Sequence, residues 1–442
     1  MTPSRIPAHR KAPRRLSQDH LTRNALFLLI STGSMGAFGF VFWIVAAHLY
    51  STVSIGRAAT VISAMSVISY LSDLGLASTL IRVLPTSQDA DAEINTALIL
   101  TSALAVVIAT AYVLVVPLFV PNVEFLRANP LHAIGFVVLN ACVAANLLTD
   151  SVFIAYRRTQ FNVVVDGLMQ GVAKLACLGV FVGLGAYGIF VASGIGGAVA
   201  VGASVVFMVW RLDYRPSLSI DFPVFVRTLR FSLSNYVGSI FLVLPLLFLP
   251  LIVVNGQGPH KAAAFLIAFN LANLAYAVSF AMSDSLFAEG SQAVVDIRTL
   301  GRRAYKLLAP VTVCLVVVIA LCAHWILLIY GSSYSRNGTP VLLVLVAALP
   351  IVTLNNIGQI LLKLRGRLNT VMLVNVAYFV VMLGLAKVWS ADGITWVALA
   401  WLLGNLVAAL LAWAGGGRPG GIYGRAQHLR SGYPQRAGAS RA

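Results

Sequence analysis

A stripe of polar residues interrupts an otherwise apolar stretch, Phe161–Leu178 ("FNVVVDGLMQGVAKLACL"). The polar residues are Asn162, Asp166, Gln170 and Lys174, and they recur at every fourth position. This spacing places them on one face of a helix. A charge at the centre of a bilayer costs at least about 2.5–3.5 kcal/mol, so it normally faces a cavity or a partner. Two roles fit Lys174: a cavity cation for an anionic substrate group, or a structural ion pair with Asp166 or with a carboxylate on another helix.

Other polar residues inside apolar runs have simpler explanations. Asp73 and Asp150 lie close to the predicted inner ends of their spans, where solvation or helix–helix hydrogen bonding satisfies a carboxylate. Asp73 and Asp166 are nevertheless candidates for ion coupling if a proton or sodium gradient drives transport. A dense amide cluster is a secondary candidate site, although hydrogen bonding between helices explains it better; it consists of Asn355, Asn356 and Gln359.

The composition places these residues in a membrane. The chain has 442 residues, of which 59% are hydrophobic and only 10% are charged, whereas soluble domains are about a quarter charged. Apolar runs of about 20 residues, each long enough to cross about 30 Å of hydrocarbon, recur along the chain. The runs predict twelve spans, at approximately 24–48, 58–83, 94–120, 132–156, 161–184, 188–210, 232–254, 262–288, 306–330, 340–362, 369–388 and 394–414.

Basic residues predict the orientation of these spans. With both termini in the cytoplasm, 25 of the 31 lysines and arginines fall on the inner side and five on the outer side; the remaining one is Lys174. This asymmetry follows the positive-inside rule. Topology and contact with anionic headgroups also explain the net charge of +17, so no nucleic-acid partner is expected. The basic tails, 1–23 and 415–442, are predicted to be disordered and cytoplasmic.

An internal repeat divides the spans into two halves. "RTQFNVV" (158–164) matches "RGRLNTV" (365–371) 207 residues later, at the start of the fifth and eleventh spans. We therefore expect two six-helix bundles, 24–210 and 232–414, joined by a cytoplasmic linker, 211–231. Six spans per half give both halves the same orientation, with a pseudo-two-fold axis along the membrane normal and a central cavity. The eleventh span has apolar residues where the fifth has Asp166, Gln170 and Lys174, so the repeat does not require the stripe.

Motifs for enzymatic chemistry are missing from the sequence. It contains no P-loop, and its seven histidines form no H-x-x-x-H or H-E-x-x-H cluster. The predicted outer loops carry only two acidic residues, Glu124 and Asp392. The four cysteines lie within apolar runs without metal-ligand spacing. We therefore expect no metal, no cofactor and no enzymatic activity.

The segment 42–85, "FWIVAAHLYSTVSIGRAATVISAMSVISYLSDLGLASTLIRVLP", resembles the opening of polysaccharide-biosynthesis (O-antigen type) flippases. These belong to the multidrug/oligosaccharidyl-lipid/polysaccharide exporter superfamily, which includes multidrug-and-toxin extruders (MATE) and lipid II flippases. The resemblance rests on Ala-x-x-Tyr-Ser at the end of the first helix, Gly56 before the second, then Asp73-Leu-Gly75-Leu and Ile81-Arg82. Twelve spans instead of fourteen argue against the lipid II subgroup.

The resemblance implies a MATE-like fold of two six-helix bundles around a V-shaped cavity. Members move polyprenyl-diphosphate-linked sugars across the cytoplasmic membrane, with cavity cations engaging the diphosphate or acidic sugars. By position, Lys174 is the best match to such a cation, with Gln170 and Asp166 beside it. Arg82 and Arg158 are weaker matches, because they also fit ordinary positively charged flanks of spans.

These observations predict a flippase that moves lipid-linked oligosaccharide across a bacterial cytoplasmic membrane by alternating access. Its partners would be the lipid-linked substrate, membrane lipids and, as further candidates, enzymes of polysaccharide assembly. A MATE-like drug or ion antiporter is one alternative and would favour a carboxylate-lined cavity. A membrane-embedded enzyme of glycan biosynthesis is the other.

Overall fold

The helices of the chain are long and apolar. The computed structural model describes residues 18–87, 89–115, 123–217, 248–277 and 297–415, with positions 241, 244, 245 and 280. Within this part of the chain, ten helical segments are long and apolar enough to cross a membrane. The predicted all-α membrane fold is therefore confirmed, and the chain is a multi-pass membrane protein.

Helices α1 to α9 and the short turns between them form the N-terminal bundle. They are α1 (Gln18–Leu49), α2 (Thr52–Asp73), α3 (Leu76–Val83), η1 (Leu84–Thr86), α4 (Ala90–Val115), α5 (Phe125–Ala128), α6 (Pro130–Ala155), α7 (Gln160–Asn162), η4 (Val163–Met169), α8 (Gln170–Val180), η5 (Val182–Leu184) and α9 (Ala186–Leu212). Helix α6 packs against α4 and α9, and α1 packs against η4 and α8.

The C-terminal bundle contains the remaining helices. They are α11 (Ile297–Leu328), α12 (Ser332–Ala347), α13 (Leu349–Leu364), α14 (Leu368–Trp389) and α15 (Ile394–Gly415). Residues 248–277 are also helical and belong to this bundle. Gly258, with φ at +78°, separates the end of the predicted seventh span from the eighth. The beginning of the seventh span and most of 278–288 lie outside the described residues.

The second predicted span differs from expectation, because it is broken near its end. Leu74 and Gly75 both have positive φ values, 48° and 76°, and these end α2 and start the separate helix α3. The carboxylate of Asp73 accepts hydrogen bonds from the backbone N–H groups of Gly75 (3.0 Å) and Ala77 (2.9 Å). A carboxylate at this position stabilises the first turn of α3. Asp73 is thus a helix-capping residue.

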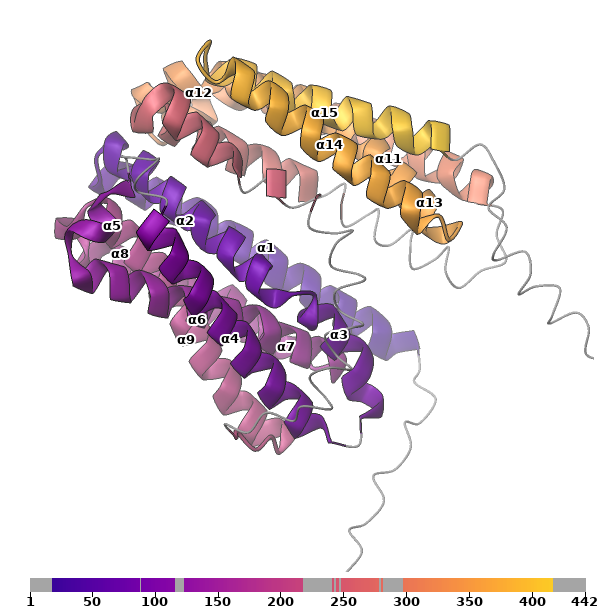
Figure 1. The fold of residues 1–442 in the computed structure, drawn as a ribbon. Coiled ribbons are helices and arrows are strands. Elements are labelled where there is room, and N and C mark those ends of the chain that lie inside the picture. The colour runs from indigo at the N-terminus through magenta and orange to yellow at the C-terminus, as the bar shows by residue number, and fades with distance from the viewer. Residues whose placement is uncertain are drawn as a thin grey trace, which may run out of the picture.

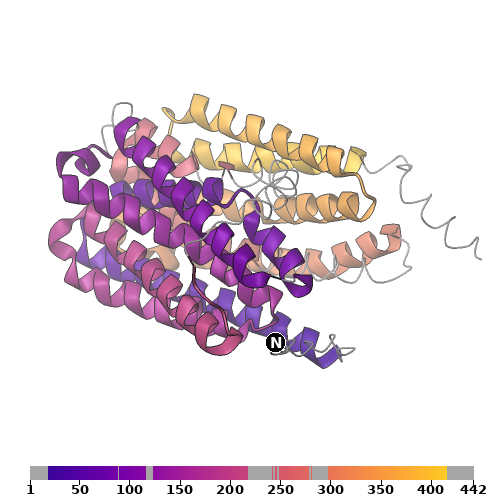
Figure 2. The same ribbon diagram turned by 60° about the horizontal axis from the view of Figure 1, so that its bottom comes forward.

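The two bundles form two layers that meet along one part of their length (Figure 1). One hydrophobic core joins residues 42–58 of α1 and α2 to 249–276 and to α11 and α12. From there the layers diverge toward the end that carries the beginning of α1 and the connection between α13 and α14 (Figures 1 and 2). A separate core at the diverging end, around Leu80 and Val152, contains residues of the N-terminal bundle alone. The bundles therefore pack together at the α1–α2 end and separate toward the other.

Candidate functional site

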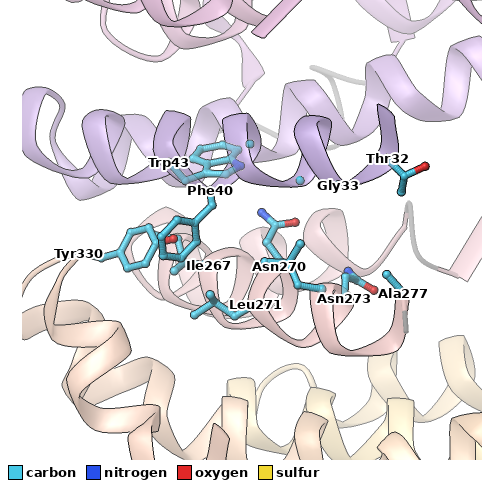
Figure 3. A pocket seen from close by; sticks show the side chains of 13 residues that line it. Thr32, Gly33, Phe40, Trp43, Ile267, Asn270, Leu271, Asn273, Ala277 and Tyr330 are labelled. Atoms are coloured by element: carbon cyan, nitrogen blue, oxygen red, sulfur yellow. The ribbon is translucent and has the colours of Figure 1, made fainter. Parts of the chain in front are cut away.

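A pocket of about 520 Å³ lies between α1 and the helical segment 267–277, at the seam of the two bundles (Figure 3). Its walls are apolar except for a few neutral polar groups. It is lined by Thr32, Gly33, Gly36, Gly39, Phe40, Trp43, Ile267, Asn270, Leu271, Asn273, Leu274, Ala277 and Tyr330. Tyr330 contributes a phenol hydroxyl, which is neutral at physiological pH because the ordinary pKa of tyrosine is about 10. The lining therefore carries no charge.

Three glycines of α1 give the pocket its room. Gly33, Gly36 and Gly39 follow one another at every third position, which places them near one face of the helix. A Cβ atom on Gly36 would lie 3.1 Å from Leu274 Cδ2, whereas Gly33 and Gly39 have open space within 4 Å. A ridge of larger side chains here would fill the space between the bundles.

The pocket is closed at one end by contacts between the bundles. Phe40 of α1 and Tyr330 of the C-terminal bundle meet edge to face, with ring centroids 5.7 Å apart. Farther along, Gly56 at the start of α2 packs on the backbone of Pro259; a Cβ atom on this glycine would lie 1.7 Å from the Pro259 carbonyl oxygen. Only a residue without a side chain permits this approach. The structure is thus closed at the α1–α2 end.

The polar stripe of the fifth span faces the interior of the N-terminal bundle. Asn162, Asp166 and Gln170 are all buried. The adjoining face packs on α1: a Cβ on Gly167 would lie 3.1 Å from Ser34 Cβ, and one on Gly171 would overlap the ring of Phe38. Helix α1 therefore separates the fifth span from the interbundle pocket, and none of the stripe residues lines that pocket.

Asp166 forms a carboxyl pair with Asp150 of α6. The two carboxyl groups lie close enough to interact electrostatically, and Asn146 Nδ2 donates to Asp166 Oδ1 over 2.9 Å. Three oxygen atoms around the pair are buried without a hydrogen-bond partner in the described part of the chain: Asn146 Oδ1, Asp150 Oδ1 and Asn162 Oδ1. Unsatisfied buried acceptors are costly. A proton or small cation between the carboxyl groups would relieve both their repulsion and this deficit of donors.

The helix of the fifth span is irregular at this pair. Residues Val163–Met169, which include Asp166, form a π-helical turn between α7 and α8, where the sequence predicts an uninterrupted helix. Insertions of this kind are rare and occur frequently at functional sites. The extra residue per turn changes the direction of the side chains that follow, so Asp166 and Lys174 are not held in simple helical register.

Lys174 belongs to α8, and its side chain packs against α9. Its aliphatic stem covers Gly196 of α9, where a Cβ atom would lie 2.5 Å from Lys174 Cγ. Asp166 attracts the ammonium group electrostatically, but the two form no ion pair among the described residues. Lys174 does not line the pocket between α1 and residues 267–277, nor does it line a second cavity at the seam of the bundles. The structure thus brings Lys174 and Gln170 together with Asp166 inside one bundle.

Arg82 and Arg158 lie elsewhere. Both are exposed, Arg82 in the last turn of α3 and Arg158 in the connection between α6 and α7. Neither lines the interbundle pocket. Their positions at the ends of spans match ordinary positively charged flanks.

The amide cluster of α13 is part of a hydrogen-bond network in the C-terminal bundle. Gln359 Nε2 donates to Asn355 Oδ1 (3.1 Å), and Asn355 Nδ2 donates to Asn405 Oδ1 on α15 (3.3 Å). Asn355 and Gln359 are buried, while Asn356 Nδ2 has no partner among the described residues. Amide bonds between adjacent helices hold membrane bundles together.

Sequence reasoning missed two parts of this arrangement. Solvation or helix–helix hydrogen bonding was expected for Asp150, but its pairing with Asp166 was not; the spacing of four residues between Asn146 and Asp150 was a signal that both face one neighbour. The glycine spacing in α1 was a second signal, since small residues at regular spacing mark a close approach of helices or a cavity.

No protein-family model matches the chain, and no curated protein matches it. Solved structures do. The inward-facing conformation of a multidrug resistance MATE family transporter of the MOP superfamily has a TM-score of 0.71 at 14% identity, covering 90% of this chain and 96% of that one. The outward-facing conformation of a transporter described in the same terms has a TM-score of 0.62 at 15% identity, covering 93% and 96%.

A third similar structure comes from Pyrococcus furiosus Vc1. It is a MOP superfamily transporter whose reverse polarity of the binding pocket is described as suggesting a different function; its TM-score is 0.62 at 14% identity, covering 93% of this chain and 96% of that one. The class is therefore a multi-pass helical membrane protein with two bundles around an interbundle pocket. Within this class, the chain has the fold of MATE transporters of the MOP superfamily.

Proposed function

We propose that this protein is an alternating-access transporter that moves a polyprenyl-diphosphate-linked oligosaccharide across the bacterial cytoplasmic membrane. The observation that carries the proposal is the uncharged pocket between the two bundles. A site at the interface of two bundles can be exposed to either side as the bundles rock against each other. The proposal includes the bundle boundaries 24–210 and 232–414 and cytoplasmic termini.

The chemistry of the pocket supports an amphiphilic substrate. Apolar walls from α1 and 267–277 suit a polyprenyl chain, while Asn270, Asn273 and Thr32 offer neutral hydrogen-bonding groups to sugar hydroxyls. A cationic drug would gain most from a carboxylate, and none of the lining residues carries one. In the MOP transporter from Pyrococcus furiosus, pocket polarity is likewise the property associated with a different function.

The carboxyl pair supplies a candidate for coupling to an ion gradient. Asp166 is buried and Asp150 is half-buried, and the two carboxyl groups interact beside buried acceptor oxygens that have no partner among the described residues. Binding of a proton or sodium ion would change the charge against which η4, α6 and α1 pack. Lys174 does not line the pocket in this structure, so we propose that it meets the anionic group of the substrate in a second conformation, in which α1 no longer covers the fifth span.

A MATE-like drug or ion antiporter is the second candidate, because the fold of the multidrug transporters fits it equally well. The two candidates differ in the charge of the substrate. A membrane-embedded glycan enzyme lacks a supporting observation among the described residues, where no group of three potential metal ligands is present.

A transport assay separates these functions. Purified full-length protein is reconstituted into vesicles with a fluorescent polyprenyl-diphosphate-linked disaccharide, and exposure of the sugar is followed with a membrane-impermeant glycosidase. We expect protein-dependent movement of the sugar, and its loss in Gly36→Leu, which fills the pocket. Gly202→Leu is the matched control, because a Cβ at Gly202 meets nothing within 4 Å. Uptake of ethidium without movement of the lipid-linked sugar would overturn the proposal in favour of a drug exporter.

A further inference from the structure

A second cavity of about 500 Å³ lies at the seam of the bundles and shares no lining residue with the first. Its walls come from α2 and α4 of the N-terminal bundle and from 248–255 and α14 of the C-terminal bundle. It is lined by Ala64, Val67, Ile68, Leu71, Ile108, Ala111, Tyr112, Phe248, Leu251, Ile252, Asn255 and Lys387. The proposed transport mechanism does not use this cavity.

The charged group and the amide of the cavity come from the ends of two helices, and Tyr112 adds a buried hydroxyl without a partner among the described residues. Lys387 lies in the last turn of α14 and Asn255 near the end of the seventh span, and both are exposed. The two segments are joined there, since Gln257 Nε2 donates to the carbonyl oxygens of Ser390 (2.8 Å) and Ala391 (2.7 Å). The other walls are aliphatic or aromatic. The cavity therefore has an apolar body and one cationic mouth at the end of a membrane-spanning helix.

A second lysine reinforces the positive charge at this mouth. Lys261 Nζ donates to Gln257 Oε1 over 2.7 Å, so its side chain is held at the same junction between the bundle segments. Lysines near the membrane surface attract anionic lipid headgroups, each contributing about 1 kcal/mol. A soluble anion would leave the apolar body of the cavity unused, and an uncharged hydrocarbon would leave the lysines without a counter-charge.

We propose that this cavity binds one anionic phospholipid. An acyl chain lies between α2, α4 and residues 248–252, and the phosphate lies at Lys387 and Asn255. The volume is in the range of sites for small amphiphilic ligands. Charge complementarity at the mouth selects the anionic headgroup, and the helix end places that headgroup at the membrane boundary, where phospholipid phosphates lie.

The lipid acts on the conformation of the transporter, because both bundles form its site. Rocking of one bundle against the other changes the separation of α2 and α4 from 248–255 and α14. A ligand shifts a conformational equilibrium by the difference in its affinity for the two states. Bound phospholipid thus stabilises the arrangement with the α1–α2 end closed, and anionic lipid content regulates the transport rate.

Native mass spectrometry of the purified full-length protein tests the site. Detergent-solubilised protein is titrated with phosphatidylglycerol or with phosphatidylcholine. We expect one phosphatidylglycerol to bind preferentially, and Lys387→Gln to lower that preference by about fivefold. Lys363→Gln is the matched control, because Lys363 is an exposed lysine in the last turn of α13 that lines neither cavity.

A second pair of variants keeps the test independent of charge. Ala111 is an exposed residue of α4 that lines the cavity, and Ala103 is an exposed residue of the same helix that does not. We expect Ala111→Trp to abolish binding of phosphatidylglycerol and Ala103→Trp to leave it intact. Equal binding by the two tryptophan variants would overturn the site. Preferential binding of polyprenyl phosphate over phosphatidylglycerol would overturn the choice of ligand, whatever the outcome of the transport assay.

Discussion

The ring of Phe40 on α1 meets the ring of Tyr330 edge to face, with centroids 5.7 Å apart, and the two residues belong to opposite bundles. Both also line the interbundle pocket. Their contact therefore closes one end of the space in which we place the substrate. The contact must break if that end opens. Substitutions at the seam between the bundles are therefore expected to shift the balance between the closed and the open conformation.

Gly56→Ala is expected to open this end. The new Cβ atom would lie 1.7 Å from the carbonyl oxygen of Pro259, so the bundles must separate at the α1–α2 end. We expect a longer distance between spin labels placed at the exposed residues Val53 and His260, measured by pulsed electron paramagnetic resonance in a variant without native cysteines. Gly202→Ala should leave the distance unchanged. An identical distance distribution in Gly56→Ala would show that the close contact of Gly56 with Pro259 does not determine the separation of the bundles at this end.

Lys174→Met tests the charge of the lysine and preserves most of its stem over Gly196. If Lys174 engages the diphosphate, loss of a charge-assisted contact should lower the apparent affinity for the lipid-linked substrate by about tenfold or more. Thermal unfolding should change little, because the packing of the stem is retained. Unchanged substrate affinity with an altered dependence on the ion gradient would assign Lys174 to the carboxyl pair.

Asp150→Asn and Asp166→Asn should uncouple transport from the gradient. Each substitution replaces a carboxyl group, which can bind a proton or a cation, with an amide that does not titrate. We expect gradient-driven transport to fall by roughly 5- to 150-fold, the range of ordinary coupling free energies, while exchange without a gradient persists. Asp73→Ala is the comparison: it should cost about 1 kcal/mol of stability through loss of the α3 cap, with coupling intact.

Tyr214 gives a prediction about pH. Its hydroxyl donates to Asn95 Oδ1 and so ties the segment after α9 to α4. Burial, and secondly the negative charge of Asp91, raise the pKa of Tyr214 to about 12. Because the folded pKa lies above the unfolded value of about 10, the stabilisation is complete below pH 10 and is lost as pH rises toward 12.

Tyr214→Phe should therefore lower the free energy of unfolding by about 1 kcal/mol at pH 8. The difference from the unsubstituted protein should shrink between pH 10 and pH 12, as followed by thermal unfolding in detergent. A difference that stays constant across this range would mean that ionisation of Tyr214 does not weaken the tether.

The sequence alone determined the fold class and the approximate spans. A membrane helix must satisfy its backbone hydrogen bonds within itself and present about 20 apolar residues to lipid. Each span can therefore be recognised in the sequence as one apolar run. Hydropathy did not predict the break after Asp73 or the π-helical turn at Asp166, because each depends on the packing of a few residues against neighbouring helices. The side of the membrane at which the termini lie stays a prediction from basic residues.

The tertiary structure alone decided which polar residues meet. Asp166 lies 16 positions from Asp150 and 20 from Asn146, and hydropathy carries no information about which faces of α6 and η4 are turned toward each other. The stripe could be read from the sequence as one polar face, but whether that face met a cavity or another helix could not. That choice depends on how helices pack around one another, since burial of Lys174 against Gly196 is a property of the α8–α9 contact and not of either segment.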